Sequence, residues 1–94
     1  NQKLKTMRPT VRQILHKIQL DEYSTSPKYK QIVNSVLTGI ERGTIKLNEV
    51  MPSINDLSML FDISRDTAEK AYRHLKSLGI LDSVPGKGFF IKST

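Results

Sequence analysis

The last third of the chain reads ISRDTAEKAYRHLKSLGILDSVPGKGFFIKS, residues 63–93, and this stretch decides the fold. It opens with Ser64, a residue type preferred as a helix N-cap, and apolar residues then recur at helical spacing. The apolar side of this predicted helix consists of Ala68, Ala71, Tyr72, Leu75 and Leu78. Gly79 is placed to end the helix, and two short β-prone runs, ILDSV and GFFIK, then flank PGKG, which signals a β-hairpin. The stretch therefore predicts a helix over residues 64–79 and a hairpin over residues 80–92.

A second capped segment, PSINDLSMLFD, comes just before this helix. Ser53 is the predicted N-cap, and Asp56 three residues later brings the segment close to a capping box. Its inward-facing residues are predicted to be Leu57, Leu60 and Phe61. Two short helices joined by a tight turn, the second with a polar outer face, are typical of a helix-turn-helix, and the hairpin makes it the winged form. In that arrangement the N-terminal end of the second helix enters the major groove of DNA, so we expect the lysine at the hairpin tip to meet the DNA backbone or the minor groove.

The segment PKYKQIVNSVLTGIERG predicts the opening helix of the domain, with Gly43 placed to end it. The broad apolar face of this helix consists of Tyr29, Ile32, Val33, Val36, Leu37 and Ile40. The following TIKLNEVM predicts an extended connector with a loose apolar alternation at Ile45, Leu47 and Val50. The predicted fold class is therefore mostly α with a small β-hairpin, a winged helix-turn-helix over residues 27–94.

An N-terminal extension, residues 1–26, precedes this domain. Pro9 suits a first helical turn, and the apolar spacing after it predicts an extra amphipathic helix from about Pro9 to Lys17. The KIQL run leaves a short strand open as an alternative, and DEYSTSP predicts a loop. Because the chain opens on Asn1 rather than methionine, we expect its start to be trimmed or processed. The role of residues 9–20 stays open between covering the core of their own domain and packing against a second copy.

Composition and charge limit the possible functions. The 94 residues carry a formal net charge of +6 and contain no cysteine. The positive charge fits a polyanionic partner. The lack of cysteine excludes a disulfide framework and a thiolate metal site, and it permits a reducing compartment. No apolar run approaches the roughly 20 residues of a membrane span, and no signal-peptide pattern opens the chain. We therefore expect a cytoplasmic protein without a membrane partner, a metal or a cofactor.

The sequence does not indicate an enzyme active site. His16 and His74 are far apart and lie in different predicted helices, with no cysteine to complete a nucleophile or metal-ligand set. PGKG lacks the spacing of a phosphate-binding P-loop and lies between two β-prone runs rather than before a helix. We expect Tyr72 and the three phenylalanines to pack in the core or the hairpin rather than to stack on single-stranded nucleic acid. We predict no catalytic residues.

The stretch from Tyr29 to Ile91 resembles the N-terminal DNA-binding domain of the GntR family of bacterial transcription regulators. The resemblance runs through YKQIVNSVLTGIERGTI, MPSINDLSMLFDISRDT, AYRHLKSLGIL and GKGFFI in uninterrupted order. It implies sequence-specific binding of a pseudo-palindromic, double-stranded DNA operator by a homodimer. It also implies a metabolite-responsive regulator whose small-molecule effector is bound by a separate C-terminal domain, which we expect to be absent from this chain.

Three positions depart from the family pattern, and at the first of them Ile54 replaces a common acidic residue. Family members commonly place one arginine at the position of Asn55 and another at that of Glu69, whereas the arginine that matches Arg65 is retained. We expect Glu69 to accept a hydrogen bond from a cytosine amino group, or to hold Arg65 or Arg73 by an i, i+4 pair. The operator sequence of other members is therefore not carried over, and an operator less rich in guanine is expected.

The residues predicted to contact DNA come from the two helices of the helix-turn-helix and from the wing. They are Ser53, Asn55, Ser64, Arg65, Asp66, Thr67, Glu69, Arg73, Gly86, Lys87 and Gly88. Arg65, at the start of the recognition helix, is predicted to contact a base or a phosphate, and Arg73 a phosphate. Both serines are predicted to be helix caps first, with phosphate contact as an added role. The two glycines are predicted to supply backbone angles closed to other residues.

Two other classes of function stay open. A winged helix also serves as a protein-interaction module without direct DNA contact. Double-stranded RNA is disfavoured as a partner because its deep, narrow major groove does not admit a recognition helix. The outward charges that bear on this choice are Arg65, Asp66, Glu69, Arg73 and Lys87. Positive charges outnumber negative ones among them, which favours DNA.

Overall fold

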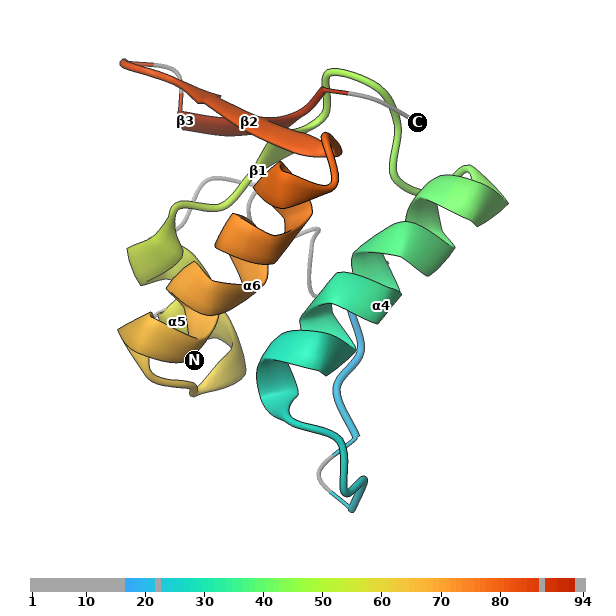
Figure 1. Cartoon of the computed structure of the whole chain (residues 1–94), viewed down its shortest axis with the longest axis vertical. Helices are drawn as coiled ribbons and strands as arrows, with labels where there is room; N and C mark the ends of the chain where they lie inside the picture. Colours follow the sequence, from blue (N-terminus) through green and yellow to red (C-terminus); the bar gives the residue numbers. More distant parts are fainter. Residues whose placement is uncertain (1–16, 22, 87, 93–94) are drawn as a thin grey trace.

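The computed structural model describes residues 17–21, 23–86 and 88–92 of the chain. In that part the elements are α4 (Lys28–Arg42), β1 (Val50–Met51), α5 (Ile54–Phe61), α6 (Arg65–Ser77), β2 (Leu81–Val84) and β3 (Gly88–Ile91). Figure 1 shows α6 between α5 and α4, with the small sheet lying across one end of the helices. The winged helix-turn-helix predicted from the sequence is confirmed. The predicted Pro9–Lys17 helix, apart from Lys17, lies outside the described residues, as do His16 and Lys87.

Side-chain caps begin both helices of the helix-turn-helix. Ser53 Oγ accepts a hydrogen bond from the backbone N–H of Asp56 at 3.0 Å. Ser64 Oγ accepts one from the backbone N–H of Thr67 at 3.1 Å. Gly43, with a φ of 82°, ends α4 in the left-handed conformation that favours glycine. The predicted caps at Ser53 and Ser64 and the predicted helix end at Gly43 are confirmed. They could be predicted because each depends on chemistry close to that residue in the chain.

The end of α6 differs from the prediction. The helix ends at Ser77, and Gly79, with a φ of 77°, turns the chain into the wing. Leu78, which was predicted to lie on the apolar side of the helix, is 50% exposed. That prediction is wrong because Leu78 follows the last helical residue. After the turn at Gly79, Ile80 and Leu81 pack in or against the core instead.

The wing belongs to a three-stranded antiparallel sheet with the order β1–β3–β2. β2 and β3 form the hairpin predicted from PGKG, with Leu81 opposite Ile91. β1 pairs with the other edge of β3, where Val50 lies opposite Phe90 and stays exposed. The sequence predicted only an extended connector here, because a pairing between residues so far apart in the chain leaves no local pattern.

The connector between α4 and β1 contains a turn rather than a regular alternation. Asn48 has a φ of 67°, and the N–H of Glu49 donates to the carbonyl oxygen of Lys46 at 3.1 Å. Ile45 is buried as the alternation predicts, whereas Leu47 is 53% exposed. The predicted alternation is therefore wrong beyond Ile45, because the turn changes which side chains face the core.

The core lies where the three helices meet the inner face of the sheet. It consists of Ile18, Ile32, Val33, Val36, Ile45, Met51, Leu57, Ala68, Ala71, Tyr72, Leu75, Leu81 and Ile91. The Tyr72 ring centroid lies 4.7 Å from that of Phe89, and the Tyr72 hydroxyl donates to the Pro52 carbonyl oxygen at 2.6 Å. Burial raises the pKa of the Tyr72 phenol, and the Asp56 carboxylate raises it further. Tyr72 therefore joins α6 to the wing and to the residue that precedes the cap of α5.

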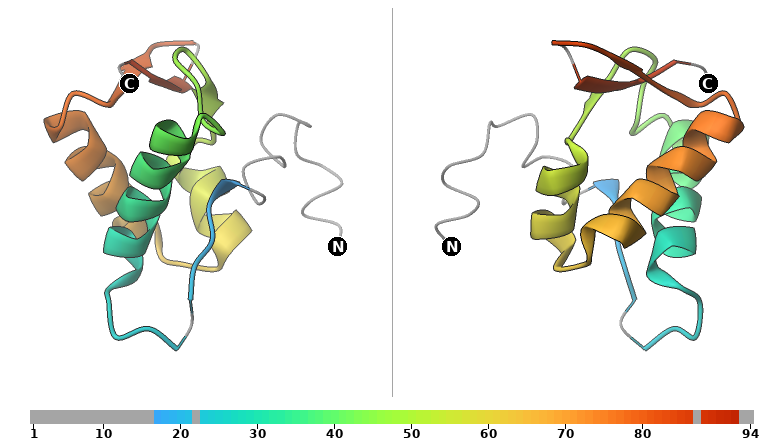
Figure 2. Two further views of the ribbon diagram at one scale, coloured as in Figure 1. Left: turned by 90° about the vertical axis from the view of Figure 1, so that its right-hand side faces the viewer. Right: turned by 60° about the vertical axis from the view of Figure 1, so that its left-hand side comes forward.

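Residues 17–21 pack against α4 although they precede the domain boundary predicted at residue 26. Ile18 is 1% exposed and belongs to the core, and Ser35 Oγ donates to the Gln19 carbonyl oxygen at 3.1 Å. Figure 2 shows this segment between α4 and α5, on the side away from α6. Ile18 therefore contributes to the core of its own domain, one of the two roles that the sequence left open. The division of the chain at residue 26 stays a prediction.

Candidate nucleic-acid interface

The predicted parts of the interface lie on one side of the molecule. In Figure 1, α5, the start of α6 and the loop end of the β2–β3 hairpin lie towards the left, whereas α4 lies towards the right. The outer side of α6 exposes Arg65, Asp66, Glu69 and Arg73, and Thr67 beside them is half-buried. The opposite side of the helix packs in the core. The start of α6, α5 and the loop end of the hairpin thus lie towards the same side in this view.

The start of α6 offers hydrogen-bond donors to an anion. Ser64 caps the N–H of Thr67, and the two hydroxyl oxygens of these residues lie 2.8 Å apart. The N–H groups of Arg65 and Asp66 belong to the first turn, where no carbonyl of the helix accepts them. The helix dipole makes this end positive, and the Asp66 carboxylate partly offsets it. A phosphate oxygen or the acceptor edge of a base suits such a site.

Asn55 and Ser53 lie at the start of α5 and are both exposed. The side-chain amide of Asn55 donates to Met59 Sδ at 3.6 Å. Because a thioether sulfur is a weak acceptor, this contact leaves the amide available to a stronger partner. The Ser53 hydroxyl already accepts the hydrogen bond that caps the helix, so a phosphate contact from it uses the remaining O–H donor.

Glu69 and Arg73 form an exposed ion pair on the outer face of α6. Arg73 Nη2 donates to Glu69 Oε1 at 2.8 Å, with i, i+4 spacing. This confirms one of the two pairings predicted for Glu69. No carboxylate of the described residues lies within ion-pair distance of Arg65. The Arg65 guanidinium is therefore open to a base or a phosphate.

Lys70 is an exposed basic residue of α6 that sequence reasoning missed, and it lies on the side of the helix towards α4. Its Nζ lies 4.3 Å from the centroid of the Tyr29 ring, a cation–π contact between α6 and the first turn of α4. Lys28 lies in the same turn of α4, whose N-cap, Pro27, makes no side-chain hydrogen bond. The outward helical position of Lys70 was visible in the sequence. Its approach to α4 was not, because that depends on how the two helices pack.

The wing tip has the backbone conformation that its glycines were predicted to supply. Gly86 and Gly88 have φ values of 84° and 85°. A Cβ atom built at either position meets nothing within 4 Å, so the requirement is for the backbone angle and not for space. Lys87, between them, lies outside the described residues, and its contact with DNA stays a prediction.

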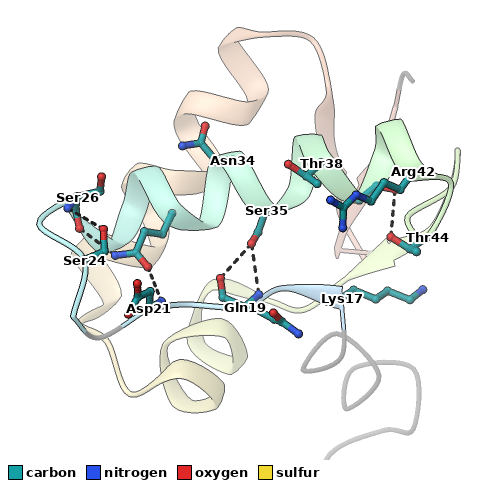
Figure 3. A pocket seen from close by; sticks show the side chains of 12 residues that line it. Lys17, Gln19, Asp21, Ser24, Ser26, Asn34, Ser35, Thr38, Arg42 and Thr44 are labelled. Carbon is teal, nitrogen blue, oxygen red and sulfur yellow. Dashed lines mark hydrogen bonds between the residues drawn. The ribbon is translucent and has the colours of Figure 1, made fainter.

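A separate polar groove of about 500 Å³ lies between α4 and residues 17–26 (Figure 3). Its lining includes Asn34, Thr38 and Arg42 from α4. Across the groove, the backbone N–H of Asp21 donates to Gln31 Oε1 of α4 at 2.7 Å. The lining contains one carboxylate and neither histidine nor cysteine.

Two further structural findings concern other classes of function. Among the described residues, no group of three or more His, Cys, Asp and Glu side chains is arranged to hold a metal ion. In the same part of the chain, no helix combines the length and the apolar character that a membrane span requires.

Comparison with known proteins identifies the family of the chain. Residues 28–91 match the family model described as bacterial regulatory proteins, gntR family. The chain belongs to the gntR family. The matched residues run from the first residue of α4 to the last residue of β3, so the whole winged helix of this gntR-family domain is included.

Relatives with known descriptions are transcription regulators. The domain is 31% identical over 74 residues to the HTH-type transcriptional repressor YtrA of Bacillus subtilis, and this match covers 79% of the chain and 57% of that protein. It is 35% identical over 66 residues to MngR of Escherichia coli, the mannosyl-D-glycerate transport/metabolism system repressor, covering 70% of the chain and 28% of that protein. The chain thus spans little more than half of the first relative and less of the second.

Solved structures agree with the fold. YtrA from Sulfolobus acidocaldarius, a GntR-family transcription factor, superposes with a TM-score of 0.74 at 31% identity, covering 83% of this chain and 82% of that one. The DNA-binding domain of AraR, in complex with operator ORX1, superposes with a TM-score of 0.64 at 38% identity, covering 77% and 86%. The family and the fold predicted from the sequence are confirmed, while the contacts of individual residues with DNA stay predictions.

Proposed function

We propose that this gntR-family domain binds double-stranded DNA in a sequence-specific manner, with α6 in the major groove and the β2–β3 hairpin against the backbone or minor groove. The observation that carries the proposal is the exposed stripe of Arg65, Glu69 and Arg73 on a capped helix whose start lies on the same side as the wing. A net charge of +6 supports a polyanionic partner. The AraR domain in complex with its operator also supports it.

Residue roles follow from position on this face. Arg65 reads a base edge from the start of α6, and Asn55 reaches a base or a phosphate from α5. Contacts that set the register on the DNA backbone come from Ser53, Ser64, Arg73 and Lys87. The groove is faced by Asp66, Thr67 and Glu69. The wing tip is shaped by Gly86 and Gly88. Lys28 and Lys70 extend the positive surface towards α4 and supply further phosphate contacts.

The longer protein implied by the relatives is a metabolite-responsive transcription regulator. We infer that it is a homodimer, that its small-molecule effector binds to a domain outside this chain, and that it acts in the cytoplasm without enzymatic activity. The repressor names of longer relatives support this inference. A dimer presents two copies of α6 to two half-sites of a pseudo-palindromic operator.

A salt-dependent binding measurement tests the proposal. Fluorescence anisotropy of a labelled DNA duplex selected from a random pool is compared with a scrambled duplex and with an RNA duplex of matched sequence, at several salt concentrations. We expect tightest binding to the selected DNA and a logarithmic affinity that falls by about 0.9 per phosphate contact for each decade of salt. Selection that enriches no sequence contradicts the proposal and favours a protein-interaction module. Equal affinity for the RNA also contradicts it, and indicates charge-driven binding of any polyanion.

A further inference from the structure

A small notch opens between α6 and the wing sheet, on the face proposed to meet DNA. It has a volume of about 200 Å³ and is lined by Ile54, Glu69, Tyr72, Arg73, Lys76 and Phe89. Tyr72 is buried and Phe89 is half-buried, so these packed rings form an apolar base for the notch. Arg73 and Lys76 are exposed and lie one helical turn apart, so two cations border an apolar floor. This combination suits a phosphate together with the deoxyribose attached to it.

Both cations already have a partner in the free domain. Lys76 Nζ makes a long, exposed hydrogen bond of 3.5 Å to Ser83 Oγ of β2. Arg73 donates to the Glu69 carboxylate at 2.8 Å, although the Arg73 and Glu69 side chains are 71% and 51% exposed. A carboxylate and a phosphate offer a guanidinium the same kind of charged acceptor. Glu69 therefore competes with a DNA phosphate for Nη2 of Arg73.

Glu69 also lies where it can reach a base. It follows Arg65 by four residues, so the two side chains share the side of α6 that is proposed to face the major groove. A glutamate in that groove accepts a hydrogen bond from the amino group of cytosine, which no other base edge offers in the same pattern. Exposed ion pairs are weak, so exchanging Arg73 for a base requires little energy.

We propose that the notch binds a backbone phosphate and that Glu69 is a specificity-determining residue that controls this phosphate contact. On random DNA, Glu69 retains Arg73 and limits the phosphate contact. On a site that presents a cytosine amino group, Glu69 accepts that hydrogen bond and releases Arg73 to the phosphate. Base reading and backbone binding are thereby coupled through one ion pair. This inference rests on the proposed DNA-binding function.

A double-mutant cycle tests the coupling. The variants are Glu69→Gln, Arg73→Gln and the combination, and the probes are the selected duplex and the scrambled duplex. We expect Glu69→Gln to tighten binding to the scrambled duplex about two- to fivefold, to change the selected duplex less, and so to reduce the specificity ratio. In the Arg73→Gln background this gain should disappear, because no arginine remains to be released. Glu41→Gln, which makes the same charge change at an exposed site on α4, is the matched control.

The proposal is overturned if Glu69→Gln raises the affinity for the scrambled duplex equally with and without Arg73. It is also overturned if Glu41→Gln gives the same gain, because the effect is then one of net charge. Phosphate binding in the notch has its own test. Lys76→Gln should reduce the salt slope by about 0.9 on the selected duplex, and by less on the scrambled duplex, where Glu69 limits the contact. Arg42→Gln, in the separate groove of Figure 3, should leave the slope unchanged. An unchanged salt slope in Lys76→Gln contradicts phosphate binding in the notch. A wild-type domain that binds neither duplex contradicts the proposed function instead, so the two failures are distinguishable.

Discussion

Replacing Tyr72 by phenylalanine removes one buried hydroxyl and leaves the volume of the side chain almost unchanged. The hydroxyl donates to the Pro52 carbonyl oxygen at 2.6 Å, and Pro52 is itself buried. In Tyr72→Phe that carbonyl loses its partner in a place where water does not easily replace it. The variant therefore tests whether the contact that ties α6 to the start of α5 stabilises the arrangement of the interface.

The cost follows from the desolvation of the carbonyl that is left without a partner. A buried group in this condition costs about 1–3 kcal/mol of the free energy of unfolding. In a domain of this size each kcal/mol lowers the melting temperature by about 4–8 °C. Thermal unfolding followed by circular dichroism at pH 7 measures the loss. Tyr23→Phe, at a side chain that is 94% exposed, is the control and should change nothing. Equal melting temperatures for wild type and Tyr72→Phe refute the reasoning.

The same variant has an expected pH dependence. In the unfolded chain the phenol ionises at its ordinary pKa of about 10, whereas burial raises the pKa in the folded domain. The stability contributed by neutral Tyr72 is therefore fully present below pH 10 and is lost above it, by about 1.4 kcal/mol per pH unit. The advantage of the wild type over Tyr72→Phe should shrink above pH 10. Parallel stability curves in that range contradict the burial of the phenol.

Three further predictions concern binding. Arg65→Ala should cost about 1–3 kcal/mol on the selected duplex and relax the preference at one base position; an equal loss on the scrambled duplex would reassign Arg65 to a phosphate. Gly88→Val should reduce DNA affinity more than thermal stability, because a β-branched residue does not adopt a φ of 85° without changing the wing tip; unchanged binding would mean that the tip does not touch DNA. The 94-residue chain should be mostly monomeric at low micromolar concentration in sedimentation experiments, and a stable dimer would instead indicate an interface in residues 9–20.

The parts of the fold that the sequence predicts are those with a local cause. Ser53 and Ser64 cap helices through hydrogen bonds three residues away, and Gly43 ends a helix through its own backbone angle. The predicted pairing of Glu69 with Arg73 is of the same kind, because i, i+4 spacing on a helix brings the two side chains together. Each of these is encoded within one turn of helix.

The parts that the sequence did not predict depend on contacts between distant segments. β1 is a strand only because it pairs with β3, and Ile18 is a core residue only because its segment passes alongside α4. The approach of Lys70 to Tyr29 and the notch beside Arg73 likewise arise from the packing of α6 against α4 and the wing. The candidate face was therefore predictable as a set of residues, whereas the notch beside Arg73 and the approach of Lys70 to α4 required the three-dimensional structure.

The central claim is that DNA is bound by the face formed by α5, the start of α6 and the wing tip. Amide chemical shifts of the ¹⁵N-labelled domain, recorded while the selected duplex is added, test it most directly. We predict that the largest changes fall on residues 53–55, 64–69 and 86–88. Residues Asn34, Thr38 and Arg42, in the separate groove of Figure 3, should change little. The largest changes on that groove, with α6 unaffected, would contradict the claim.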